Sequence, residues 1–93
     1  MSDQPERPLV YIVDDDADLG ASLARLLKRA GFAAEPFLDP EQLLHAYAAA
    51  PADCIVTDVM MGEMDGFAFA DHLRAMDRAA AIEFMSQSKM TNA

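Results

Sequence analysis

The sequence predicts an α/β domain built on a parallel sheet. Short apolar runs alternate with segments of helical period along the chain, which is the pattern of successive β-α-β units. The first of these runs is apolar throughout, as expected for a strand that is covered on both faces. With 93 residues, the chain forms one small domain.

The first strand and helix are expected within residues 9–30. Residues 9–13 (LVYIV) form the strand and lead directly into three consecutive aspartates. Asp16 or Asp18 is suited to cap the following helix, and Gly31 stands where a helix commonly ends. The apolar residues of this segment recur with helical spacing and predict one buried face, made of Leu19, Leu23, Leu26, Leu27 and Ala30.

The second strand and helix are expected within residues 32–50. Residues 32–37 (FAAEPF) form a weaker strand, and Pro36 removes one ladder donor, so this strand should lie at a sheet edge. Asp39 followed by Pro40 is a strong start signal for a helix. The buried face of that helix is expected to contain Leu43, Leu44 and Tyr47.

Two further strands flank a third helix. Residues 53–59 (DCIVTDV) predict the third strand, which ends near Asp58. A loop, MMGEM, leads to Asp65-Gly66 and a helix whose buried face is expected to contain Phe69, Leu73 and Met76. Residues 81–86 (AIEFMS) predict the fourth strand.

Right-handed crossovers and an edge position for the second strand favour the strand order 2-1-3-4. The chain then reverses direction between the first and third strands, where open α/β sheets bind their ligands beyond the carboxyl ends of the strands. Asp14 and Asp15 follow the first strand and Asp58 ends the third. Three converging carboxylates repel one another unless a cation or a shared proton relieves them. These residues alone leave three interpretations open: a bound cation, a shared proton, or a solvated acidic run beside the helix cap.

Composition narrows the function classes. Acidic residues outnumber basic ones by 16 to 7, for a net charge of −9, which argues against nucleic acid as a partner. No apolar stretch is long enough to cross a membrane, and the polar first residues, of which 1–7 are expected to be a disordered tail, do not resemble a signal peptide. We expect a cytoplasmic protein in which Cys54 is a buried, inert thiol.

Three segments together resemble the response regulator receiver family. They are YIVDDD with the leucine-rich helix after it, CIVTDVMMGEMDGF, which is similar to the family's phosphorylation motif, and FMS in the fourth strand. The resemblance extends from Leu9 to Gln87, nearly the whole chain. It implies a flavodoxin-like, doubly wound sheet (CheY-like), here without the family's last helix, strand and helix.

The resemblance also implies a chemistry. Asp58 would accept a phosphoryl group from a histidine kinase or phosphotransfer protein, and Ser86 would contact that group. Asp15 would ligate Mg²⁺ directly and Asp14 mainly through water, while Met60 would contribute its main-chain carbonyl. These roles agree with the oxygen ligands and retained waters that Mg²⁺ prefers.

The sequence departs from the family at several positions. Gly62 and Glu63 replace the usual proline of the loop after the phosphoacceptor, Glu83 stands where an apolar residue is usual, and Gln87 follows Ser86 where a small residue is usual. The family's active-site lysine lies on a later strand, and Lys89 is too close to Ser86 to be that lysine. We expect the surface that the family's last helix, strand and helix would cover to be exposed here. Such surface favours a homodimer or an exchange of elements with a second copy.

Three other functions are conceivable for a chain with these motifs. A receiver-derived interaction or dimerisation fragment that no longer signals through phosphate remains open. A magnesium-dependent phosphohydrolase is disfavoured, because no second acid stands two residues beyond Asp58. A calcium-binding EF-hand loop is rejected, because Leu19 and Arg25 occupy the positions that require Gly and Glu.

Overall fold

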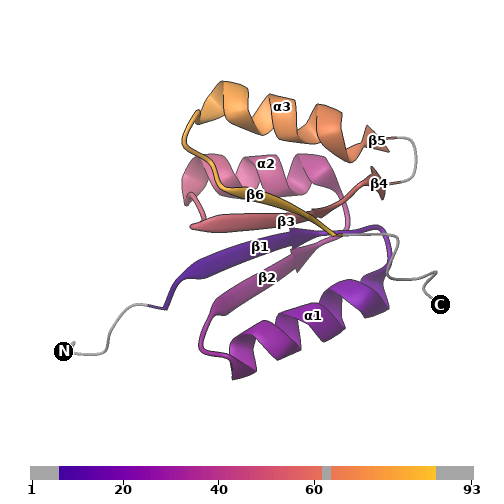
Figure 1. Ribbon diagram of the computed structural model, residues 1–93, viewed down its shortest axis with the longest axis vertical. Helices are drawn as coiled ribbons and strands as arrows, with labels where there is room; N and C mark the ends of the chain where they lie inside the picture. The colour runs from indigo at the N-terminus through magenta and orange to yellow at the C-terminus, as the bar shows by residue number, and fades with distance from the viewer. Residues whose placement is uncertain (1–6, 62–63, 86–93) are drawn as a thin grey trace.

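A computed structural model of the chain describes residues 7–61 and 64–85. Four strands and three helices alternate in it, with a small hairpin between the third strand and the third helix (Figure 1). In chain order the elements are β1 (Leu9–Val13), α1 (Ala17–Arg29), β2 (Ala33–Phe37), α2 (Pro40–Ala49), β3 (Cys54–Asp58), β4 (Met60–Met61), β5 (Met64–Asp65), α3 (Gly66–Met76) and β6 (Ile82–Met85).

The four main strands form one parallel sheet in the order β2-β1-β3-β6. This is the predicted order 2-1-3-4, with β6 as the fourth strand. The proline-bearing β2 lies at one edge, as expected from its missing donor. The sequence did not predict the antiparallel β4–β5 hairpin, in which Met60 pairs with Asp65, because two-residue strands in a methionine- and glycine-containing segment carry no periodic signal.

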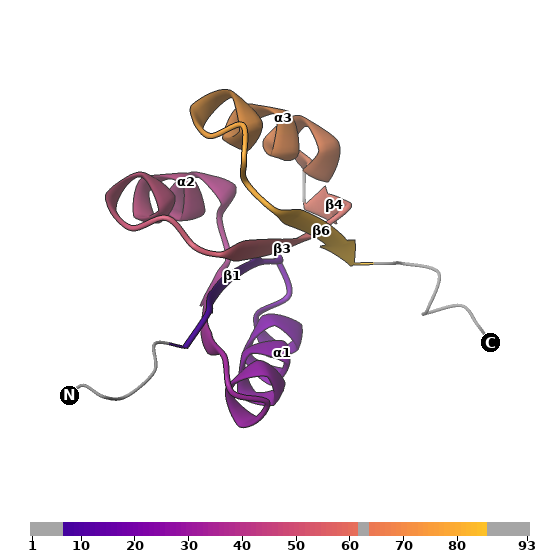
Figure 2. The same cartoon turned by 60° about the vertical axis from the view of Figure 1, so that its left-hand side comes forward.

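The helices cover the sheet from both sides. Figure 2 shows α1 on one face and α2 with α3 on the other. The core on the α1 side is built from Val10, Ile12, Ala24 and Ala34. The core under α2 and α3 is larger and contains Tyr11, Val13, Leu43, Tyr47, Ile55, Phe69 and Leu73. Every residue of β1 from Val10 onward is buried, which explains its continuous apolar sequence.

Each helix begins at an aspartate cap. The Asp16 side chain accepts hydrogen bonds from the main-chain amides of Asp18 and Leu19, so Asp16 rather than Asp18 is the cap of α1. Asp39 and Asp65 cap α2 and α3 by accepting one such hydrogen bond each, from the amides two residues further on. After α1 the chain turns through Gly31 at a φ of 105°, a left-handed conformation that favours glycine.

The predicted buried faces of two helices are partly wrong. Helix α1 buries Gly20 and Ala24, while the Leu19 and Leu26 side chains are 41% and 59% exposed. In α3 the Met76 side chain is 48% exposed, although Phe69 and Leu73 are buried as expected. Helical spacing predicts a stripe of neighbours, but the small residues of α1 are the ones that lie nearest the sheet.

Cys54 is half-buried, so the prediction of a buried thiol is wrong in degree. Burial still raises the pKa of this thiol, and the nearby Glu83 and Asp53 charges raise it further. Glu83 is exposed on β6, which among the described residues pairs only with β3. An exposed glutamate on an edge strand carries no burial cost.

None of the helices in the described part of the chain has the length and apolarity that crossing a membrane requires. The expected tail at residues 1–7 lies outside the described residues except for Arg7, and its disorder stays a prediction.

Candidate functional site

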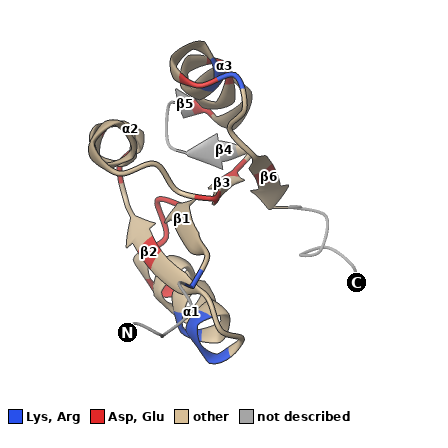
Figure 3. Cartoon of the chain, turned by 90° about the vertical axis from the view of Figure 1, so that its left-hand side faces the viewer, with Lys and Arg blue, Asp and Glu red and all other residues tan. Residues whose placement is uncertain are grey.

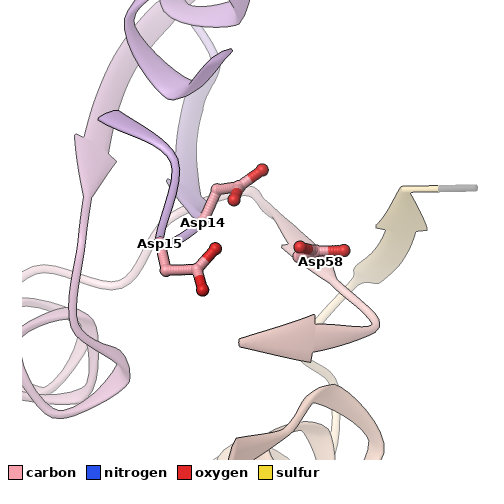
Figure 4. A group of neighbouring side chains, drawn as sticks. All are labelled: Asp14, Asp15 and Asp58. Atoms are coloured by element: carbon pink, nitrogen blue, oxygen red, sulfur yellow. The ribbon is translucent and has the colours of Figure 1, made fainter. Parts of the chain in front are cut away.

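Three aspartates meet beyond the carboxyl ends of β1 and β3. Asp14 and Asp15 follow β1, and Asp58 is the last residue of β3. Figure 4 shows their side chains turned toward the same space. One carboxylate oxygen of each lies within 4.8 Å of the others. We call these residues the carboxylate cluster.

Asp14 is buried and is hydrogen-bonded through both its main chain and its side chain. Its side chain is 2% exposed, and its amide donates a 3.1 Å hydrogen bond to the Phe37 carbonyl, which extends the β1–β2 ladder by one residue. Its Oδ1 atom accepts a 2.9 Å hydrogen bond from the Asp16 amide. Its buried Oδ2 atom has no hydrogen-bond partner among the described residues. A buried acceptor without a partner is costly unless a ligand or a proton completes it.

The electrostatics of the cluster favour a cation. Burial raises the pKa of the Asp14 carboxyl, and the charges of Asp58 and Asp15 raise it further, against the opposing effect of the Asp16 amide. Asp58 is 9% exposed, whereas Asp15 is exposed to solvent. The basic residues on helices lie on the second half of α1 and on α3, away from the ends of β1 and β3 (Figure 3).

The donor set fits a hard divalent cation. Carboxylate oxygens are the ligands that Mg²⁺ takes in proteins, and Mg²⁺ usually keeps several waters. The free Oδ2 of Asp14 offers one oxygen, and exposed Asp15 leaves the site open to water. Asp14, Asp15 and Asp58 would therefore be the residues that hold such an ion.

The other predicted site residues are placed less fully. Met60 begins β4 two residues after Asp58, and it pairs there with Asp65. Ser86, the Gly62-Glu63 loop, Gln87 and Lys89 lie outside the described residues. Two residues that the sequence did not assign to the site, Thr57 and Gly66, contact the main chain of Asp58. A fully buried threonine beside a strand-end aspartate had no distinct signal in the sequence.

Comparison with known proteins identifies the family. The model of the response regulator receiver domain matches residues 10–93. The chain belongs to the response regulator receiver family. Receiver domains of this family act in two-component signalling, and their acidic cluster is where Mg²⁺ binds.

Curated relatives of this receiver include two named transcriptional regulatory proteins. PrrA of Mycobacterium leprae is 37% identical over 79 residues, which cover 85% of this chain and 34% of PrrA. RprY of Bacteroides fragilis is 34% identical over 86 residues, which cover 92% of this chain and 36% of RprY. The receiver thus spans about a third of the length of these relatives.

Solved structures agree with the fold of the receiver. Full-length FixJ from B. japonicum superposes with a TM-score of 0.78 at 32% identity, covering 88% of this chain and 40% of FixJ. CheY4 of Vibrio cholerae also gives a TM-score of 0.78, covering 91% of this chain and 75% of CheY4. CheY4 is 24% identical and bears on the fold alone. The predicted CheY-like, doubly wound fold is confirmed.

Proposed function

We propose that this receiver accepts a phosphoryl group on Asp58 from a histidine kinase or phosphotransfer protein, in the presence of Mg²⁺. The observation that carries the proposal is the carboxylate cluster, with its oxygens within 4.8 Å and one buried oxygen of Asp14 unpartnered. A bound Mg²⁺ would neutralise charge between the incoming phosphoryl group and the carboxylates. Met60 would add its main-chain carbonyl to the metal site, and Ser86 would contact the phosphoryl oxygens.

In the proposed transfer Asp58 would act as the nucleophile, and neighbouring residues would hold the site in place. An Asp58 carboxylate oxygen would form a bond to phosphorus while the bond from phosphorus to the donor's imidazole nitrogen breaks. The electron pair of the broken bond would stay on that nitrogen. Asp14 would be held in place by the Asp16 amide during transfer. The domain would act as a switched acceptor and not as an enzyme with a product of its own, in keeping with a cytoplasmic signalling role.

Intact-protein mass spectrometry tests the proposal. Wild type incubated with a small-molecule phosphodonor should gain one phosphoryl group with Mg²⁺ and little without it. Asp58→Asn should gain none. Asp18→Asn makes the same chemical change at an exposed residue of the first turn of α1, outside the carboxylate cluster, and should behave as wild type. Absence of the gain in folded wild type, or its persistence in Asp58→Asn, would refute the assignment of Asp58.

A second candidate function is protein association without phosphate signalling. Two observations favour it. Among the described residues β6 has a strand neighbour on one side only. The ring of Phe67, which is 54% exposed, lies against that of Phe84 in β6, with 4.6 Å between ring centroids and the planes tilted by 42°. An open strand edge beside exposed aromatic surface favours pairing with another chain. A second copy of this receiver is the simplest such partner.

A further inference from the structure

Gly66 packs against the main chain that carries the phosphoacceptor. It is the first residue of α3 and is buried, and its amide donates a 2.6 Å hydrogen bond to the Val59 carbonyl. A Cβ atom at this position would lie 2.9 Å from the Val59 carbonyl oxygen and 3.1 Å from its carbonyl carbon, and it would overlap the carbonyl oxygen of Asp58. Any side chain at residue 66 would therefore displace main chain at Asp58 and Val59.

The requirement at Gly66 is steric and not conformational. Among the described glycines only Gly31 has a positive φ, so the backbone angles of Gly66 are open to any residue. Gly20 provides the contrast within the same chain. It is also a buried glycine in a helix, but a Cβ there would meet only the Pro36 Cβ atom at 3.6 Å, an ordinary van der Waals distance.

Thr57 restrains the same carbonyl by a hydrogen bond. Its side chain is fully buried, and its Oγ1 hydroxyl donates to the Asp58 carbonyl oxygen at 3.0 Å. The Asp58 main chain is thus restrained by the Thr57 hydroxyl and by the Gly66 Cα group. The Gly66 amide restrains the next carbonyl, that of Val59, at the base of the β4–β5 hairpin.

We infer that Gly66 and Thr57 are positioning residues for the phosphoacceptor, which set where the Asp58 carboxylate lies relative to Asp14 and Asp15. This inference rests on the proposed function. Mg²⁺ demands near-ideal octahedral geometry, and functional constellations tolerate displacements of only about 0.5 Å. A shift of the main chain at Asp58 would move the Asp58 carboxylate out of the cluster. It would also move the main chain at Met60, where β4 begins.

The paired glycine variants test the inference. Gly66→Ala should weaken Mg²⁺ binding by about tenfold or more, the range seen when groups that support metal ligands are removed, as measured by NMR titration of the folded protein. Without metal, the amide signals of Asp58, Val59 and Met60 should already be displaced. Gly20→Ala should bind Mg²⁺ within about twofold of wild type, since its added methyl group meets only an ordinary contact.

The threonine variants provide a test that does not depend on the folding of Gly66→Ala. Thr57→Val removes the hydroxyl and should weaken Mg²⁺ binding, whereas Thr57→Ser keeps the hydroxyl and should retain it. Urea unfolding of all four variants separates loss of affinity from loss of stability, because a purely structural role would lower stability in Thr57→Val and leave affinity intact.

The outcomes distinguish this inference from the proposed function. If wild type binds Mg²⁺ and both Gly66→Ala and Thr57→Val bind it as wild type does, the inference is wrong while the proposed function stands. If Gly66→Ala does not fold, the two Thr57 variants decide in the same way. If wild type binds no Mg²⁺, the proposed function loses its metal. The metal-free amide signals of Asp58, Val59 and Met60 then decide. If these signals are displaced in Thr57→Val but not in Thr57→Ser, the positioning role is supported. If they are not displaced in Thr57→Val, the positioning role is wrong.

Discussion

Tyr11 and Tyr47 each bury a hydroxyl that donates one hydrogen bond of 2.7 Å, but their acceptors differ. Tyr11 donates to the main-chain carbonyl of Ala50, and Tyr47 donates to the Oδ2 carboxylate atom of Asp77. Burial and the Asp77 carboxylate raise the pKa of Tyr47 to about 12. The same hydrogen bond, with that of the Ala79 amide, lowers the pKa of Asp77. These bonds link the end of α2 to β1 and to the end of α3.

The Tyr47–Asp77 bond should make stability depend on pH. A carboxyl whose pKa is lower in the folded state stabilises the fold above its unfolded pKa, and this contribution is lost as the pH falls through the folded pKa. Tyr47→Phe should therefore destabilise the receiver more at neutral pH than at a pH where Asp77 is protonated. Urea unfolding at both pH values measures the difference, and carbon NMR titration should show the pKa of Asp77 rising in the variant.

Tyr11→Phe is the matched control for that experiment. It also removes a buried hydroxyl and a 2.7 Å hydrogen bond, but the Ala50 carbonyl that accepts the bond does not titrate. Its effect on the free energy of unfolding should be equal at the two pH values. An equal loss in Tyr47→Phe at both pH values would contradict a role for the Asp77 charge.

At the scale of elements, α1 shows what periodicity leaves open. Its leucines share one broad stripe, yet the buried positions are Gly20 and Ala24, whose small size lets the helix lie close to the sheet. The position of β1 was more predictable, because a strand buried on both faces must be apolar throughout. The helix starts were also predictable, because each has a capping aspartate in the sequence. The depth of each leucine depends on the approach of α1 to the sheet, which local sequence does not encode.

Two opposite substitutions in α1 test that packing. Ala24 is 4% exposed, so Ala24→Leu should overfill the contact with β1 and β2 and lower the free energy of unfolding by about 1–3 kcal/mol. Leu26 is 59% exposed, so Leu26→Ala should change it by no more than about 0.5 kcal/mol. Urea denaturation of both variants provides the measurement. A larger loss in Leu26→Ala than in Ala24→Leu would mean that α1 lies on the sheet by a different face.

At the scale of the whole molecule, the two outer strands of the sheet formed by the described residues are unlike. Each of these strands carries one charged residue, Glu35 in β2 and Glu83 in β6, but only β2 contains a proline, Pro36, and it is therefore the poorer template for a further strand. Strand order and the meeting point of Asp14, Asp15 and Asp58 could be predicted, since crossover handedness and topology decide both. The contact of Gly66 with the Asp58 carbonyl could not, because it depends on the exact path of the main chain after β3.

Self-association through the β6 edge should be measurable by light scattering. Wild type should show a molecular mass that rises with concentration, and Phe67→Glu should reduce this rise by placing a charge beside β6. Leu38→Glu is the matched control, because Leu38 is 56% exposed, close to the 54% of Phe67, but follows β2 at the other edge. A monodisperse monomer at high concentration would count against association.

The central place of β1 has a consequence for synthesis. β1 pairs with β2 on one side and β3 on the other, so the first 58 residues already contain three adjacent strands of the sheet and all members of the carboxylate cluster. During translation the chain emerges from its N-terminus, and these aspartates become available to one another before α3 exists. In a nascent chain the three carboxylates would therefore repel one another before Phe69 and Leu73 are present. The packing of these two side chains, which offsets the repulsion, would form only afterwards.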